Sequence, residues 1–150
     1  MLKRVFRRAF FIALFIKQNR HHKHSVLIHT LKVAYYAFKA KEFKMIPAAI
    51  LHDIGKPIVA YQDEKDKITG EYSFTNHEEI GYQLIKKIPF ISNYTKNLVR
   101  YHYLIRGIQK AHEKGQTGKY KRLKRNFNKL DQNFIKDLEK FLIFDDKAKK

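Results

Sequence analysis

The sequence has 150 residues, of which 44% are hydrophobic; this predicts one domain with its own core and excludes a disordered chain. It contains no cysteine, which excludes disulfides and thiolate metal sites, so any metal must be held by nitrogen and oxygen ligands. With 32 Lys and Arg against 14 Asp and Glu, the net charge of +18 predicts a polyanionic partner: nucleic acid, a nucleotide or an anionic membrane surface. The absence of cysteine also fits a reducing compartment, and we expect a cytoplasmic protein.

Residues 1–24 form a basic and apolar arm. Four basic side chains precede the apolar run of residues 9–16, which no small-residue cleavage site follows. The run is far shorter than the roughly 20 apolar residues that span a bilayer. For residues 1–17 we predict an amphipathic helix packed on the domain, with a peripheral membrane helix as the alternative. The histidine-rich residues 21–24 are interpreted as a solvated basic patch.

Two predicted helices follow the arm. Ser25 is the expected N-cap of a helix that runs to about residue 41 and turns His29 inward with its apolar residues. The next helix spans about residues 44–53 and ends in His52 and Asp53, after which Gly55 and Pro57 stop it. Imidazole and carboxylate are both metal ligands, but a His-Asp pair and a lone inward histidine are each also common in ordinary cores. Further candidate ligands along the chain strengthen the metal interpretation.

The middle of the chain supplies two more inward histidines. Residues 58–73 are polar and are predicted to be a loop or short hairpin with solvated carboxylates. A capping-box pattern at residues 75–79 predicts a helix with His77 in its first turn. The next predicted helix runs from residue 92 or 93 to 106, carries His102 within an apolar stripe and is ended by Gly107.

The last helix is predicted over residues 132–149. Asp145 falls on its apolar face, whereas Asp146 lies about 100° further round and is the alternative. A carboxylate on an apolar face requires a cation or hydrogen-bond donors. Asp145 is therefore the better candidate for a buried ligand.

Residues 108–130 are strongly basic and are predicted to form a loop insertion. One interpretation is a flexible, solvated excursion. The other is a grip on a phosphate backbone, with an affinity that falls steeply with salt because binding releases counterions. The basic residues, with Tyr120 and Phe127 interleaved, are Lys110, Lys114, Lys119, Lys121, Arg122, Lys124, Arg125 and Lys129.

Taken together, these motifs resemble the HD superfamily of metal-dependent phosphohydrolases. His29 opens a segment similar to the first motif of that superfamily, and Leu-His-Asp-Ile-Gly-Lys at residues 51–56 is similar to the second. Residues 51–107 most resemble the HD domain attached to bacterial tRNA nucleotidyltransferases. They share the His-Asp-Ile-Gly-Lys-Pro segment, the Asn-His-Glu helix start at residues 76–78 and the Val-Arg-x-His pattern at residues 99–102.

The resemblance, which covers about residues 25–148, implies an all-α fold: a single HD-type bundle of about six to seven helices within residues 1–150. It implies one or two divalent ions, with Mn, Mg, Co, Ni, Fe and Zn all suited to the ligand types. The implied ligands are His29, His52, Asp53 and Asp145, with Asp146 as the alternative. His77 and His102 are expected to bind a second ion or the substrate phosphate.

The expected activity is hydrolysis of a phosphate ester of a nucleotide or of RNA, RNA being favoured over DNA, with a metal-activated water as nucleophile. The sequence shows no nucleotidyltransferase head, so we expect hydrolysis without nucleotide addition. Asp53 is the candidate general base, and Lys56 is expected to neutralise charge on the phosphoryl group. Further candidate phosphate-binding residues are Arg100, Arg106, Lys121, Arg122 and Arg125. The alternatives are a nucleotidase acting on free mononucleotides or signalling nucleotides, and a nucleic-acid-binding module with a structural or vestigial metal site.

Overall fold

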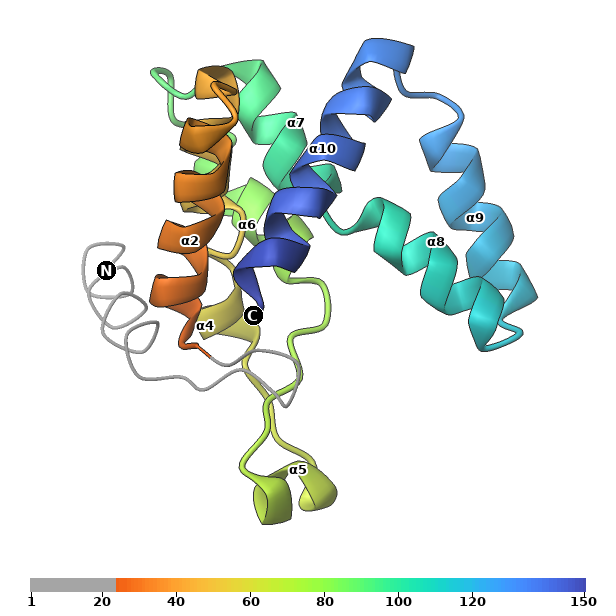
Figure 1. Ribbon diagram of the computed structural model, residues 1–150. Helices are drawn as coiled ribbons and strands as arrows, with labels where there is room; N and C mark the ends of the chain where they lie inside the picture. The colour runs from red at the N-terminus through yellow and green to blue at the C-terminus, as the bar shows by residue number, and fades with distance from the viewer. Residues whose placement is uncertain (1–23) are drawn as a thin grey trace.

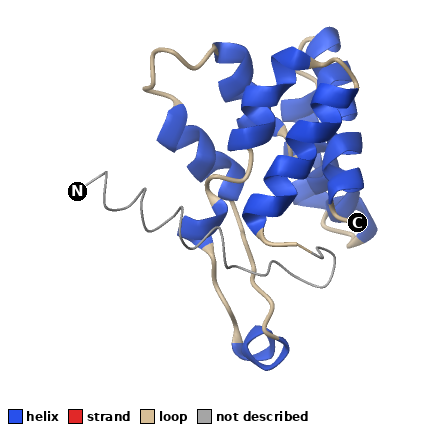
Figure 2. Ribbon diagram, turned by 60° about the vertical axis from the view of Figure 1, so that its left-hand side comes forward, coloured by secondary structure: helices blue, strands red, loops and turns tan. Residues whose placement is uncertain are grey.

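The computed structural model describes residues 24–150, and this part of the chain is all-α, as predicted (Figures 1 and 2). Six of its helices have nine residues or more, in line with a bundle of about six to seven. This part has no strand, although Tyr61 and Ser73 form an isolated antiparallel bridge. The predictions for residues 1–17 and 21–23 lie outside the described part. The elements are α2 (Val26–Lys39), the 3₁₀ helix η1 (Phe43–Met45), α3 (Ile46–Leu51), α4 (Lys56–Val59), α5 (Glu64–Thr69), α6 (His77–Ile85), α7 (Asn93–Tyr101), α8 (Leu104–Glu113), α9 (Thr117–Phe127) and α10 (Gln132–Ala148).

The core lies between α2, α3, α7 and α10. Its largest fully buried side chains include Met45, Leu98 and Phe141, packed with Val33 of α2 and Val99 of α7. Each such apolar side chain stabilises the fold by about 1.5–3 kcal/mol. Because α10 packs along α2 in this core, the end of the chain lies beside the helix that carries His29 (Figure 1).

A buried carboxylate fixes the N-terminal half of α10. Asp137 accepts hydrogen bonds from the Tyr94 hydroxyl at 3.0 Å and from Lys44 Nζ at 2.8 Å. Burial, together with this bond to Asp137, raises the pKa of Tyr94, so the phenol stays protonated and keeps donating. Asp137 therefore links η1, α7 and α10.

Several predicted helix boundaries are confirmed. Ser25 caps α2 and Ser92 caps α7, each by accepting a bond from a backbone N–H three residues later. The predicted helix over residues 44–53 is present as η1 followed by α3, after which residues 52–55 turn and Pro57 enters the first turn of α4. Residues 58–73 contain the predicted pairing of two chain segments at Tyr61, but α5 forms at its tip with Asp63 as N-cap.

The capping box predicted at residues 75–79 is wrong. Asn76 precedes α6 in a left-handed conformation, with a φ of 60°, and its side chain makes no capping hydrogen bond. Glu79 is not available for capping because its carboxylate accepts a bond from Arg100 at 2.9 Å. The left-handed turn at Asn76 is what starts α6 with His77 as its first residue.

The single helix predicted to end at Gly107 is wrong as well. The chain breaks after α7, at His102 and Tyr103, and restarts as α8, within which Gly107 is buried. At the break the Val99 carbonyl accepts a hydrogen bond of 2.7 Å from the His102 ring, which competes with the helical ladder. Gly107 does not end the helix; it faces Leu123 and allows α9 to approach α8 closely.

The basic segment at residues 108–130 is not a loop. It consists of the second half of α8, a turn at Gly115 with a φ of 64°, and α9. Lys and Arg are good helix formers, and Tyr120, Leu123 and Phe127 recur at helical spacing, so charge alone was a poor guide to backbone conformation. The segment forms a helical hairpin that extends to one side of the bundle (Figure 1).

None of the helices formed by residues 24–150 combines the length and apolarity needed to cross a membrane.

The turn after His52 depends on a close contact with α6. A Cβ added to Gly55 would lie 2.1 Å from the His77 carbonyl oxygen and 2.8 Å from the Gly81 nitrogen, and both are backbone atoms that cannot rotate away. We expect Gly55→Ala to lower the free energy of unfolding by about 1–3 kcal/mol, the usual cost of overpacking, as measured by urea denaturation. Gly81→Ala is the control because its Cβ would meet side-chain atoms of Val99 and Ile54 at 3.3 and 3.4 Å and the Gly55 nitrogen only at 3.6 Å, an ordinary contact distance. Equal costs for the two variants would contradict the role given to Gly55.

Candidate metal centre

Four parts of the fold bring the predicted ligands together. His29 comes from α2, His52 and Asp53 from the turn after α3, and Asp145 from α10. The remaining two candidates, His77 and His102, come from the first residue of α6 and the break between α7 and α8. All except Asp145 are buried, and the Asp145 side chain is only 14% exposed. Residues spread over 116 positions of sequence thus converge on one buried site.

The first cluster consists of His29, His52, Asp53 and Asp145. Oδ2 of Asp53 lies 3.3 Å from His52 Nε2 and 3.8 Å from His29 Nε2. Oδ1 of Asp145 lies 2.9 Å from His29 Nε2 and 3.8 Å from His52 Nε2. Ligand atoms bound to one ion at about 2.1 Å are themselves about 3 to 4.2 Å apart, so these separations match the edges of a coordination shell.

The second cluster consists of Asp53, His77 and His102. The other carboxylate oxygen of Asp53, Oδ1, lies 3.5 Å from His77 Nε2 and 3.9 Å from His102 Nε2. The two imidazole Nε2 atoms are 3.2 Å apart. Asp53 therefore faces one pair of histidines with each of its oxygens, and it is shared by the two clusters.

Backbone carbonyls fix the tautomers of three of the rings. Nδ1 of His52, His77 and His102 lies 2.7, 2.8 and 2.7 Å from the carbonyl oxygens of Ala49, Phe74 and Val99, respectively. A carbonyl can only accept, so each Nδ1 carries the hydrogen and donates it. In the neutral rings Nε2 then presents a lone pair toward Asp53, and this is the arrangement of histidines that bind metal through Nε2.

The residues fit a divalent cation. His52 Nε2 is buried and has no hydrogen-bond partner. His77 and His102 point the lone pairs of neutral rings at each other across 3.2 Å, which is unfavourable unless a cation lies near both. Nitrogen and oxygen donors of this kind suit Mn, Fe, Co, Ni and Zn, and carboxylate oxygen also suits Mg.

Charges inside the site shift several pKa values. Burial alone would lower the pKa of His52, but the charges of Asp53 and Asp145 outweigh it and raise the pKa. Burial lowers the pKa of His77, and burial with the neighbouring His52 and His77 lowers that of His102 to about 3. Burial would raise the pKa of Asp53, but His52 and Lys56 together hold it well below its usual range.

Three cations border the clusters. Lys56 is buried and places Nζ 2.7 Å from Asp53 Oδ2. Lys149 Nζ lies 2.7 Å from Asp145 Oδ2, and Arg106 lies 3.6 Å from the same oxygen. Sequence reasoning missed Lys149; the available signal was its position four residues after Asp145, on the same face of α10.

The structure separates the remaining predicted residues from the centre. Asp146 is half exposed and pairs with Arg106 and Lys149, so Asp145 is the carboxylate that reaches the histidines. Arg100 pairs with Glu79 and stacks on Tyr82, which engages it between α6 and α7. The other three predicted phosphate-binding residues lie on α9 in the projecting hairpin: Lys121, Arg122 and Arg125.

Comparison with known proteins identifies the family. The HD domain model matches residues 26–136, which is most of the chain and includes the His29, His52 and Asp53 positions. The protein belongs to the HD domain family. HD domains are in general metal-dependent hydrolases, and the buried histidine and aspartate groups of this HD domain can hold a divalent metal. None of the curated proteins matches the sequence.

The two clusters predict two metal sites of separable composition. We expect purified protein loaded with Mn²⁺ to contain two ions per chain, and His102→Ala to contain one, because that substitution removes a ligand of the second cluster only. The measurement is metal analysis combined with calorimetric titration. His112→Ala is the matched control, since this exposed histidine of α8 lies in neither cluster. One ion in the wild type and an unchanged value in His102→Ala would contradict the second site.

The two sites should differ in their response to pH. The pKa of His52 is raised, so below about pH 6.5 a metal must displace its proton, whereas the lowered pKa values of His77 and His102 leave those rings neutral. Between about pH 7.5 and about pH 6, Mn²⁺ affinity should therefore fall more in His102→Ala, which keeps the first cluster, than in His52→Ala, which keeps the second. Titrations followed by electron paramagnetic resonance test this, and the reverse order would overturn it.

Proposed function

We propose that this HD domain is a phosphodiesterase or phosphatase that hydrolyses phosphate esters of nucleotides or of RNA, with two divalent ions. The observation that carries the proposal is Asp53, whose two oxygens each face a separate pair of buried histidines. A shared carboxylate is the expected ligand between two closely spaced ions. Two-ion sites of this kind stabilise the attacking and the leaving oxygen of an in-line displacement at phosphorus.

Bound divalent ions would supply an acidified water as nucleophile and polarise the phosphoryl group. The protein would hold them with His29, His52, Asp53 and Asp145 at the first cluster, and with His77 and His102 at the second. No nucleophilic side chain is needed. Asp145 Oδ1 faces the histidines while Oδ2 is held by Lys149 and Arg106, so this carboxylate is oriented before a substrate arrives.

Lys56 and Arg106 are proposed to contact the substrate phosphate. Lys56 already lies within 2.7 Å of Asp53 in a buried position, where its charge is little screened. Arginine side chains commonly bind two phosphate oxygens at once. The Arg106 side chain is 21% exposed and lies beside Asp145. These cations would neutralise charge that develops on the phosphoryl group during the reaction.

Asp53 is proposed to act as general base only while it is bound to metal. Its pKa is held well below the usual range by His52 and Lys56, which makes the free carboxylate a weak proton acceptor near neutral pH. This favours Asp53 as the shared ligand that also accepts a hydrogen bond from the attacking water.

The substrate class is proposed from charge and from motif similarity. A net charge of +18 favours a polyanionic substrate. The similarity of residues 51–107 to the HD domain of tRNA nucleotidyltransferases favours RNA ends, including 2′,3′-cyclic phosphates. A nucleotidase acting on free nucleotides would differ by a weak dependence on salt, and a binding module by a lack of any turnover. A cytoplasmic location is part of the same proposal.

A substrate panel tests the function. We expect Mn²⁺- or Co²⁺-loaded protein to hydrolyse at least one of bis(p-nitrophenyl) phosphate, 2′,3′-cyclic nucleotides, 5′-mononucleotides and short RNA. His52→Ala and Asp53→Ala should each lower kcat/KM by at least about a hundredfold, since loss of even a supporting partner of a ligand costs about 10- to 100-fold. His112→Ala should match the wild type.

Hydrolysis that persists unchanged in both ligand variants would show a contaminating activity and would contradict the proposal. Binding of metal and nucleic acid with no turnover of any substrate on the panel would favour the binding module instead.

A further inference from the structure

The hairpin of α8 and α9 carries a row of cations that the metal centre does not use. Helix α9 and the turn after it contain no acidic residue between residues 117 and 129. Its apolar side chains, Tyr120, Leu123 and Phe127, are partly buried, and Leu123 meets α8 at Gly107. The opposite face is exposed and holds the four residues that we call the α9 stripe: Lys121, Arg122, Arg125 and Lys129.

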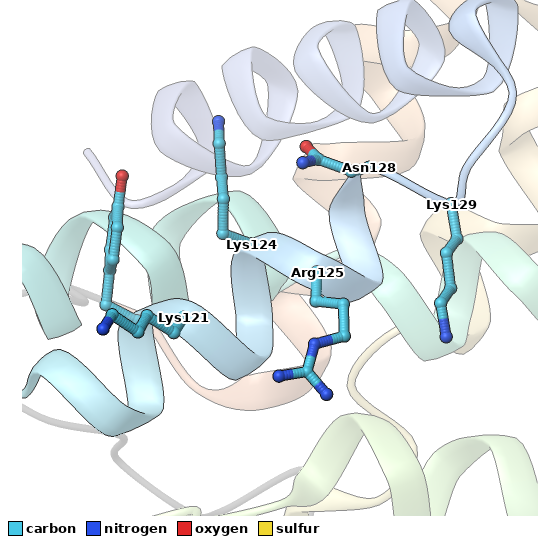
Figure 3. Close-up of a pocket in the computed structure, with 6 residues that line it drawn as sticks. Lys121, Lys124, Arg125, Asn128 and Lys129 are labelled. Carbon is cyan, nitrogen blue, oxygen red and sulfur yellow. The ribbon is translucent and has the colours of Figure 1, made fainter.

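The α9 stripe is positioned by helix geometry. At a rise of about 1.5 Å per residue, the three stripe residues on α9 span about 6 Å along one side of the helix, and Lys129 continues the row in the turn after it. Within the part of the chain that the structure describes, none of the four side chains forms a hydrogen bond or an ion pair; the backbone N–H of Lys129, at the end of the helix, donates to the Asn126 carbonyl. Three of the stripe residues, with Tyr120, Lys124 and Asn128, line an open hollow on the hairpin (Figure 3).

The hairpin starts at the metal centre. Tyr103, which follows His102 at the break, packs its ring 5.7 Å from the His77 ring and places its hydroxyl 2.8 Å from Lys110 Nζ. Arg106, in the first turn of α8, contacts Asp145. The hairpin therefore leads away from the clusters along a helix that already contributes side chains to their border.

We propose that the hairpin is a docking arm for the phosphate backbone of a nucleic-acid strand, with the α9 stripe as its grip. The arm rests on the proposed function in one respect: the docked strand would carry the ester that reaches the clusters. The stripe offers ammonium and guanidinium groups, which suit phosphate oxygens and carry no base-specific readout.

An anionic membrane is the competing polyanion, and the packing of α9 disfavours it. A helix that lies on a bilayer inserts an apolar face beside its cations. In α9 Leu123 packs on α8 at Gly107 and the Tyr120 ring lies against His112 of α8, so the stripe itself has no apolar side chain to insert. The surface therefore suits a soluble polyanion with charges spaced along a chain.

The test is the salt dependence of binding to a fluorescently labelled single-stranded RNA of about 20 nucleotides, measured on the full chain by anisotropy. Each phosphate contact on a single strand adds about 0.7 to the slope of log K against log salt. The double variant Lys121→Gln/Arg125→Gln should lower that slope by about 1.4. The control Lys86→Gln/Lys87→Gln removes the same charge from exposed lysines after α6 and should leave the slope unchanged.

Two further arms decide the outcome. Far-UV circular dichroism and Mn²⁺ content should be unchanged in the α9 variant, which shows that the fold is intact. An unchanged RNA slope, or an equal loss in the control, overturns the arm. It is also overturned if phosphatidylserine vesicles bind in a stripe-dependent way while RNA does not bind.

His52→Ala separates this proposal from the proposed function. We expect it to lose hydrolysis and retain the RNA affinity of the wild type, because its substitution lies outside the hairpin. RNA binding through α9 without hydrolysis by the wild type would support the docking arm and contradict the proposed enzymatic function. Hydrolysis without stripe-dependent RNA binding would support the enzymatic function and contradict the docking arm.

Discussion

The structure depends on one buried carboxylate. Asp53 is 2% exposed, and an ionised group so far from water is tolerated only when cations or donors surround it. Here Lys56 lies at 2.7 Å from Oδ2, and four histidine rings approach the two oxygens from both sides. The packing of the helices that supply these groups must also keep Asp53 compensated, so fold and candidate chemistry share one constraint.

The histidines around Asp53 differ from Lys56 in that their rings are held in fixed orientations. Three of the rings are oriented by carbonyls of their own helix or turn, at Ala49, Phe74 and Val99, so each is aimed before any ligand binds. Preorganisation of this kind lowers the entropy that metal binding must overcome. The arrangement leaves lone pairs facing one another in the interior, which is costly in an empty structural core and useful around a cation.

The sequence predicted the fold class and the residues of the clusters because both depend on local patterns. Ser25 as a cap, inward His29 and the His52-Asp53 pair at a helix end can each be recognised from a few neighbouring residues. The break at His102, the left-handed Asn76 and the helical hairpin could not be recognised in that way. They arise from tertiary contacts: a ring bonded to a backbone carbonyl, Glu79 taken by Arg100, and Leu123 packed on Gly107. Lys149 was missed although its spacing of four residues from Asp145 was visible, because i, i+4 ion pairs are common on exposed helix faces and only the structure shows this pair beside His29.

The interruption between α7 and α8 links two parts of the molecule mechanically. His102, whose imidazole faces Asp53, lies at the break after which the hairpin begins. Tyr103, the next residue, packs its ring on that of His77. A displacement of the outer end of the hairpin would therefore act on residues that adjoin His102 and contact His77. Because Arg106 of α8 contacts Asp145, such a displacement would reach the first cluster as well as the second.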